Sequence, residues 1–262
     1  MPEGPETHRI ADRLRDAIAG EVLTRVRFID PALKRFEAKL RRREVLAVQA
    51  RGKALLTTVD GGWTLYTHSQ LFGFWRIDGG DAGDDGPTAP RLQLETARCR
   101  ARLFAAPSIQ VIATDAVDAH PFLRKLGPDV IPRTTTVRHI KRQLADARFA
   151  RKPLADLLLD QSFAAGMGNY LRSEVLHAAR IAPKRTPASL APEESASLAR
   201  ALLSVPRASY RAQTRIGSRH ATEGFRFKVF ERDGEPCPRD GHPIEQVRLG
   251  GRRLYWCPAC QH

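Results

Sequence analysis

Eight short runs of strand-forming residues between positions 21 and 115 restrict the fold of this chain more than any other feature. Glycine and aspartate residues separate the runs, and Asp60-Gly61-Gly62 is typical of a hairpin turn. So many short strands in one stretch are typical of two packed antiparallel sheets, so we predict an antiparallel β-sandwich. The runs cover residues 22–29, 45–50, 54–59, 63–68, 72–77, 92–96, 101–105 and 109–113.

Helical spacing of apolar residues replaces this pattern after His120-Pro121, and it also occurs before the sandwich, over residues 5–20. The later segments with this spacing are 137–147, 153–161, 170–179 and 193–203. A further alternating run, 225–230, predicts a strand near the C-terminus. The fold class is therefore α+β, with predicted domains at residues 1–120, 121–222 and 223–262.

The charge of the chain predicts a polyanionic partner. The 262 residues carry a formal net charge of +14, and the basic residues are spread along the chain. Nucleic acid is the first candidate and a membrane surface is the second. No apolar run approaches a membrane-spanning length and no leader pattern is visible, so we expect a soluble, cytoplasmic and nucleoid-associated protein. Nothing suggests a dimer interface, so we expect a monomer.

The chain start, Met1-Pro2-Glu3-Gly4-Pro5-Glu6, carries groups suited to covalent chemistry. Removal of Met1 would leave Pro2 with a secondary amine, and a terminal amine with a pKa near ~8 is partly neutral at cellular pH. Such an amine is a nucleophile that forms an iminium with an aldehyde-level carbon. Glu3 would place a carboxyl group near the same carbon to transfer a proton. The alternative interpretation is a frayed terminus with an incidental proline.

A glycine turn, Gly166-Met167-Gly168, precedes the predicted helix at 170–179. Asn169 is a candidate N-cap for that helix, whose free backbone N–H groups would suit a phosphate. A plain connection between two helices of an all-helical domain is the alternative interpretation.

Cysteines near the C-terminus indicate a metal site. Cys257 and Cys260 have the spacing of half a zinc ribbon, whereas the other half has Cys237 alone, with Asp240 where a second cysteine would stand. We favour a site of three cysteines completed by His242. An oxygen ligand from Asp240 and a metal-free hairpin are the alternatives. Between the two halves, Gly250-Gly251-Arg252-Arg253 is predicted to form a turn whose arginines project from the hairpin tip.

Seven sequence blocks together resemble the endonuclease VIII branch of the formamidopyrimidine-DNA glycosylase family over essentially the whole chain. Gly4 and the tryptophan before Cys257 are similar to that branch rather than to the oxidised-purine branch. The blocks are Pro2 to Glu6, Arg51 to Leu56, His68 to Gly73, His120 to Leu123, Gly127 to Val130, Gly168 to Arg172, and Tyr255 to Gln261.

The resemblance implies a bifunctional DNA glycosylase and AP lyase that removes oxidised pyrimidines from damaged double-stranded DNA. In that reaction the damaged base is flipped out and the Pro2 amine displaces it at C1′ of the sugar. Glu3 protonates the opening sugar, and β,δ-elimination from the resulting Schiff base removes the nucleotide. One structural zinc is implied as cofactor.

Further roles follow from the resemblance by position. Lys53, predicted to lie on the strand that follows Arg51-Gly52, would contact a phosphate and assist the first elimination. Arg252 would grip a phosphate and assist the second, with Arg253 beside it as a second choice of register. Gln70, Leu71 and Phe72 would fill the space left by the flipped nucleotide.

Two other residues are implied to bind the DNA backbone. Lys125 and Asn169 would hold phosphates, and Glu174 would lie in the helix that Asn169 opens. Without the resemblance, Lys53 would be a surface lysine, the 70–72 loop would be strand-end core, and Arg252 would be a solvated charge.

Other functions compete with this interpretation. An oxidised-purine glycosylase of the same family is one, and a non-catalytic DNA-binding zinc protein is another. Tautomerases that use an N-terminal proline act in much shorter chains and do not need the glycine turn or the hairpin.

Overall fold

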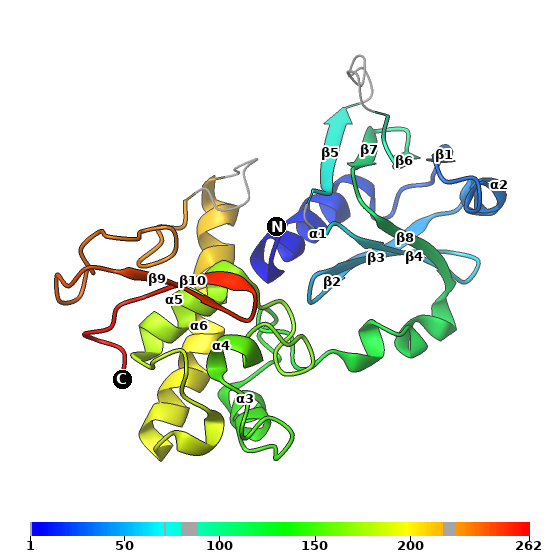
Figure 1. Ribbon diagram of the computed structural model, residues 1–262. Helices are drawn as coiled ribbons and strands as arrows, with labels where there is room; N and C mark the ends of the chain where they lie inside the picture. The colour runs from blue at the N-terminus through cyan, green and yellow to red at the C-terminus, as the bar shows by residue number, and fades with distance from the viewer. Residues whose placement is uncertain (1, 71, 80–88, 217–223) are drawn as a thin grey trace. The chain divides into compact units, whose positions relative to one another are not determined.

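A computed structural model describes residues 2–70, 72–79, 89–216 and 224–262 of the chain (Figure 1). Their contacts divide them into two compact units. The first contains Pro2 and residues 7–124, and the second contains Glu3–Glu6 and Lys125–His262. The predicted domain boundary at 222/223 lies outside the described residues. Within the described residues, no helix is both long and apolar enough to cross a membrane.

Two four-stranded antiparallel sheets form most of the first unit, as predicted, and each predicted run overlaps a strand. One sheet has the order β1-β6-β7-β5 and the other β2-β3-β4-β8. The strands are β1 (Arg25–Phe28), β2 (Val45–Arg51), β3 (Ala54–Val59), β4 (Trp63–His68), β5 (Phe74–Gly79), β6 (Leu92–Glu95), β7 (Cys99–Phe104) and β8 (Ser108–Ala113).

One apolar core joins both sheets to the long N-terminal helix α1 (Gly4–Ile18). Ala11, Leu14 and Ile18 lie on one face of α1 and are buried in that core, which explains the helical spacing seen in the sequence. The turn between β3 and β4 contains Gly61 and Gly62, both at positive φ, as the predicted hairpin requires. Smaller elements of this unit are η1 (Lys34–Phe36), α2 (Glu37–Leu40) and η2 (Thr114–Ala119).

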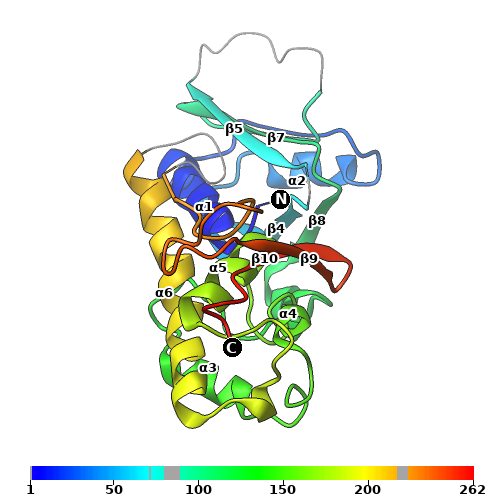
Figure 2. The same ribbon diagram turned by 60° about the vertical axis from the view of Figure 1, so that its left-hand side comes forward.

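The second unit is mainly helical, and α5 lies at its centre. Nearly every residue of α5 (Asn169–Ala179) is buried, because the helix packs against both α6 (Pro192–Ile216) and the C-terminal hairpin (Figure 2). The hairpin strands are β9 (Glu245–Leu249) and β10 (Arg252–Trp256). The other elements are α3 (Val137–Leu144), α4 (Leu154–Leu157) and η4 (Pro187–Ser189), and the short helix η3 (Leu123–Lys125) precedes them.

The strand predicted over residues 225–230 is absent, and this prediction was wrong. The backbone N–H groups of Lys228, Val229 and Phe230 donate to the Glu174 carboxylate on α5 at 2.9–3.0 Å. The segment therefore bends around a buried acceptor instead of pairing with another strand, which alternation of apolar residues alone cannot reveal.

Candidate functional site

The Glu3 side chain is buried at the start of α5. Its carboxylate accepts hydrogen bonds from the backbone N–H groups of Tyr170 (3.0 Å) and Leu171 (3.2 Å). A helix N-terminus stabilises negative charge through its unpaired N–H groups and its dipole. The anion site expected at this helix start is therefore used by a carboxylate of the chain itself. Pro2 is half-buried and next in sequence to Glu3, which is followed by the first residue of α1.

The glycine turn holds the chain start through close backbone contacts. The Gly4 N–H donates to the carbonyl oxygen of Gly166 at 2.7 Å, and Gly166 has φ of +90°. A Cβ atom on Gly168 would lie 2.2 Å from Cδ of Glu3. Gly166 and Gly168 are therefore both required for the close approach of the Glu3-Gly4 segment. The turn thus has a role beyond connecting two helices, which was the alternative interpretation.

Asn169 is not the N-cap that the sequence predicted, because Gly168 takes that position. The Asn169 side chain instead donates from Nδ2 to the carbonyl oxygen of Arg253 at 2.9 Å. Its amide therefore connects the start of α5 to the hairpin.

A buried polar chain that the sequence analysis missed continues from Glu3. The Glu6 carboxylate accepts the Glu3 N–H at 2.7 Å and the Tyr170 hydroxyl at 2.9 Å, and that hydroxyl lies 3.0 Å from Oγ of Ser209. Burial and then the Glu6 charge raise the pKa of Tyr170 well above its ordinary value of 10, so the hydroxyl stays protonated. The spacing of Glu3 and Glu6, typical of a capping box, was the available signal.

The hairpin turn is built by Gly250 and Gly251, at φ of 59° and 70°. Two consecutive positive φ values match the right-handed twist of antiparallel strands. Arg252 and Arg253, predicted to belong to the turn, are instead exposed residues of β10. Their side chains point to opposite faces because they are adjacent in a strand.

Arg172 of α5, which was quoted only as part of a motif, fixes the hairpin to the helix. Its buried guanidinium donates to the carbonyl oxygens of Leu249 (3.3 Å) and Arg253 (3.1 Å), and to Oδ1 of Asn169 (2.7 Å). Burial lowers the pKa of Arg172 to about 10, and the Arg252 charge contributes to the lowering. Arg172 therefore remains charged at neutral pH, and Arg252 lies close to it.

In the first unit, Lys53 lies in the two-residue turn that joins β2 to β3 and not on the strand itself. The turn is tight because Gly52 has φ of +62°. Lys53 is near His68, which lies at the end of β4. Burial is the main cause that lowers the pKa of His68, and the positive charge of Lys53 lowers it further. This histidine is therefore mostly neutral at neutral pH.

The loop after β4 exposes Phe72 to solvent. The Phe72 side chain is 77% exposed, so the alternative that it belongs to the core is wrong. Gln70 is exposed at φ of +46°, and the Gly73 N–H closes the loop on Ser69 at 2.8 Å. Leu71 lies outside the described residues.

Lys125, the last predicted DNA-binding residue, is exposed at the end of η3 in the second unit. Within the described part of the chain it forms no ion pair with a carboxylate. Its ammonium group is therefore available to an external anion.

Cys237, Asp240, Cys257 and Cys260 form a group suited to binding one zinc ion. One ligand atom from each residue lies within 4.8 Å of the others, and the three thiols are buried. Both carboxylate oxygens of Asp240 lie 3.5 Å from Sγ of Cys257. Three sulfurs and one oxygen make a four-ligand set of types that zinc accepts.

The preference for His242 as fourth ligand is corrected by this geometry. His242 is not in the group, and its side chain is exposed. Its backbone N–H donates to Oδ1 of Asp240 at 3.0 Å, which orients that carboxylate. The turn places the aspartate, rather than the residue two positions later, beside the thiols.

Two neighbours of this group were not anticipated. His177 of α5 lies with Nε2 3.5 Å from Sγ of Cys237, and burial followed by the Arg239 charge lowers the pKa of His177 to about 4. Arg239 donates to the His177 carbonyl oxygen at 2.9 Å and to Sγ of Cys260 at 3.6 Å. A neutral imidazole and a cation beside the sulfurs are suited to support thiolates around a metal.

We expect the purified protein to contain about one zinc ion per chain. The Asp240→Ala variant should bind that zinc less tightly, because it keeps only three protein ligands. Asp240→Cys should hold zinc more firmly because it supplies a fourth thiolate. Metal analysis after timed exposure to a chelator measures both effects. His242→Ala is the matched control, and zinc loss in His242→Ala with none in Asp240→Ala would reverse the assignment.

Comparisons with known proteins agree with both units. The family description "Formamidopyrimidine-DNA glycosylase N-terminal domain" matches residues 1–115, "Formamidopyrimidine-DNA glycosylase H2TH domain" matches residues 126–219, and "Zinc finger found in FPG and IleRS" matches residues 234–262.

Curated relatives are similar over the full length of both chains. A protein named Endonuclease 8 from Klebsiella pneumoniae subsp. pneumoniae is 44% identical over 100% of each chain. One of the same name from Pectobacterium atrosepticum is 43% identical, again over 100% of each.

Among solved structures, the fold is similar to that of Lactococcus lactis Fpg in complex with DNA containing an abasic site. The TM-score is 0.86, with 21% identity and 99% of each chain covered. A structure of MutM with DNA containing carbocyclic 8-oxo-G also gives a TM-score of 0.86, at 23% identity over 100% of each chain. With domain matches, full-length relatives and a shared fold in agreement, this chain belongs to the formamidopyrimidine-DNA glycosylase family.

Proposed function

We propose that this protein is a bifunctional DNA glycosylase and AP lyase of base-excision repair that removes oxidised pyrimidines from damaged double-stranded DNA. The observation that carries the proposal is the Glu3 carboxylate, buried on the N-terminus of α5 directly beside Pro2 in the chain. A buried carboxylate next to a potential amine nucleophile provides a proton-transfer group and a covalent catalyst at one place.

The first step uses the amine of Pro2, once Met1 has been removed. Its lone pair forms a bond to C1′ of the damaged nucleotide, and the bond from C1′ to the base breaks with the electrons leaving on the base. The Glu3 carboxylate takes the proton from the positively charged Pro2 nitrogen and transfers it to the sugar ring oxygen as the bond from C1′ to that oxygen breaks, which leaves an iminium between C1′ and nitrogen. The departing base takes a proton from water. The Gly4–Gly166 hydrogen bond supports this step, because it holds the chain start in place.

Two eliminations then cleave the strand. The iminium acidifies the C2′ proton, and loss of that proton expels the 3′ phosphate; a second loss expels the 5′ phosphate. Lys53 assists the first elimination and Arg252 the second by neutralising phosphate charge. The tight turns that carry Lys53 and Arg252 support these roles, since both cations stand at rigid hairpin ends.

The remaining contacts position the DNA. Gln70, Leu71 and Phe72 fill the space left by the flipped nucleotide, and the exposed ring of Phe72 supports this role because an unburied aromatic group is suited to stacking on bases. Lys125 and Asn169 hold phosphates. Zinc on Cys237, Asp240, Cys257 and Cys260 would hold the fold of the finger and take no part in the chemistry.

Oxidised pyrimidines rather than purines are the proposed lesions because relatives at 43–45% identity are named Endonuclease 8, whereas the Fpg and MutM structures compared above are only 21% and 23% identical. Side-by-side cleavage of duplexes that carry thymine glycol or 8-oxoguanine measures the preference. Faster cleavage of the 8-oxoguanine duplex would favour the oxidised-purine alternative.

Borohydride trapping on an oligonucleotide with one abasic site tests the reaction itself. We expect a covalent protein–DNA adduct, and mass spectrometry of the cross-linked peptide should place it on the Pro2 nitrogen. A zinc-loaded protein that binds the DNA and gives no adduct would contradict the proposal and favour a non-catalytic DNA-binding protein.

Arg252→Ala should lower DNA affinity and leave more β- than δ-elimination product, because the side chain that neutralises the departing phosphate is gone. Because one phosphate contact is lost, roughly one counterion fewer should be released on binding, so the affinity should fall less steeply with salt concentration. Gel analysis of the products measures the ratio. Arg253→Ala is the control from the opposite strand face, and an unchanged ratio in Arg252→Ala would assign the role elsewhere.

A further inference from the structure

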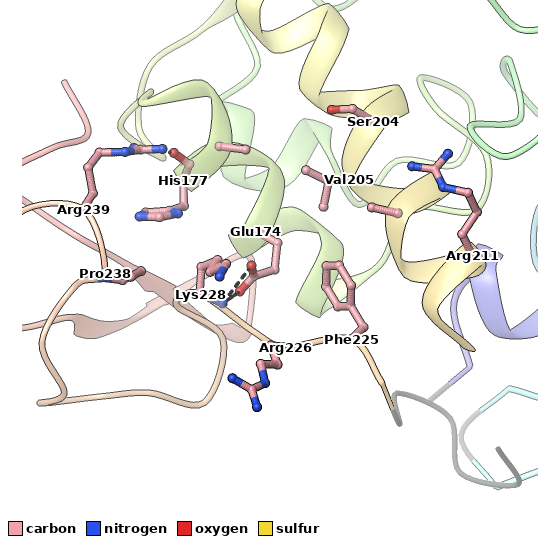
Figure 3. Close-up of a pocket in the computed structure, with 12 residues that line it drawn as sticks. Glu174, His177, Ser204, Val205, Arg211, Phe225, Arg226, Lys228, Pro238 and Arg239 are labelled. Carbon is pink, nitrogen blue, oxygen red and sulfur yellow. Dashed lines mark hydrogen bonds between the residues drawn. The ribbon is translucent and has the colours of Figure 1, made fainter. Parts of the chain in front are cut away.

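A second concave site lies in the helical unit, between α5, α6 and the segment 225–228 (Figure 3). Its volume is about 620 Å³, within the range that takes small-molecule ligands. None of the residues assigned above to catalysis or metal coordination lines it, although His177 and Arg239, which lie beside the cysteines, are part of its wall. Its existence therefore needs a separate explanation.

One wall of the pocket is apolar. Val205 and Ala208 of α6 contribute to it, together with Phe225 and Pro238. Figure 3 shows the Phe225 ring rising from its segment toward α6. Phe225 is braced by aromatic neighbours, with its ring centroid 6.3 Å from that of Tyr170 and 6.0 Å from that of Phe227. A fixed ring on an apolar wall is suited to contact with another flat ring.

Exposed cations surround this wall. Arg211, Arg226 and Lys228 line the pocket, and Arg211 and Arg226 form no ion pair with any carboxylate in the described ranges. The carboxylate that lines the pocket, Glu174, is already bound by the N–H groups of residues 228–230. Positive charge is therefore in excess here, and it favours an anionic group.

We propose that this pocket binds one nucleotide unit, with its base against Phe225 and Val205 and its phosphate held by Arg226 with Lys228 or Arg211. An apolar ligand would leave the cations unused, and inorganic phosphate would leave the apolar wall unused. A base joined to a phosphate uses both, as ring stacking and phosphate binding do in single-strand recognition. The unit is either a free nucleotide or a nucleotide of a single DNA strand.

Calorimetry on the full-length protein tests the free nucleotide. The probes are dTMP, thymidine and inorganic phosphate, and dTMP should bind at least about tenfold more tightly than either part alone, since it makes both sets of contacts. Arg226→Ala should weaken dTMP binding by about tenfold, as expected for one lost charge-assisted contact. Ser204→Trp, at an exposed position that lines the pocket, should abolish binding by filling it.

Arg200→Ala is the matched control, because Arg200 is an exposed arginine of α6 that does not line the pocket. Thermal unfolding of each variant shows whether it is folded, and this measurement does not depend on the reaction at Pro2. A fall in dTMP binding in Arg200→Ala equal to that in Arg226→Ala would overturn the proposal, because it would indicate non-specific charge.

Photo-crosslinking tests the DNA strand as the source. A single-stranded oligonucleotide with 5-iododeoxyuridine should crosslink to the peptide that contains Phe225, and Ser204→Trp should remove that crosslink. Crosslinking without dTMP binding supports a nucleotide within a strand, and dTMP binding without crosslinking supports a free nucleotide. Absence of both, in folded protein, overturns the proposal.

Discussion

Replacing Glu3 with glutamine is expected to abolish release of damaged bases while sparing strand cleavage at a preformed abasic site. Base release needs a proton donor at the opening sugar, and a positioned general acid typically contributes about 10²–10⁴-fold in rate. A preformed abasic site has already lost its base, so the Pro2 amine can react with it without that proton transfer. Single-turnover assays on a lesion duplex and on an abasic duplex measure the two rates.

The local hydrogen bonds define the controls for Glu3→Gln. The carboxylate accepts from two backbone N–H groups of α5, and a glutamine amide offers only one acceptor oxygen. A cost in stability of roughly 1–3 kcal/mol is expected for the unpaired N–H. Thermal unfolding of the variant is therefore recorded beside Glu193→Gln, an exposed change in the first turn of α6. Equal loss of both activities in folded protein would contradict the role of Glu3.

Replacing Gly168 with alanine is expected to reduce base release by about 10²-fold or more, a typical effect of misplacing a reacting group by about 1 Å. The new Cβ atom would lie 2.2 Å from Cδ and 2.4 Å from Oε1 of Glu3, so the carboxylate must move. Gly168 has φ of −147°, which alanine adopts readily, so the effect is steric rather than a backbone strain. The same single-turnover assay on the lesion duplex measures it.

Gly79→Ala is the matched control for Gly168→Ala, because a Cβ atom there would meet no atom of the described residues within 4 Å. A double variant identifies the cause of the loss. If Gly168→Ala acts by displacing Glu3, it should reduce base release little further in a Glu3→Gln background. Additive losses in the double variant would show that Gly168 acts independently of Glu3.

Much of the fold followed from local patterns. The eight runs between residues 21 and 115 each overlap a strand, and the helices α1, α3, α5 and α6 begin within one residue of their predicted segments. These predictions succeeded because periods of two and of about 3.6 residues report directly which side of an element is buried. The 225–230 segment failed because its N–H groups bind the distant carboxylate of Glu174, which no local period records.

The residues of the candidate site could likewise be predicted only in part. Residues marked by type and spacing, such as Pro2, Glu3 and the cysteines, were recognisable from the sequence and from the resemblance it carries. Arg172 and Ser209 were not, because an arginine or serine within a helical pattern has no signal that separates a buried hydrogen-bonding role from a solvated one.

The sequence by itself therefore determined the order of strands and helices, the family, and the chemical groups available at the chain start and near the C-terminus. Only the tertiary structure decided which groups meet. It brought Glu3 to the first turn of α5, 167 residues from Tyr170 in the chain, and it chose Asp240 over His242 for the metal group. The physical reason is that buried polar groups must be paired, and their partners are found through the folded backbone rather than through neighbouring sequence.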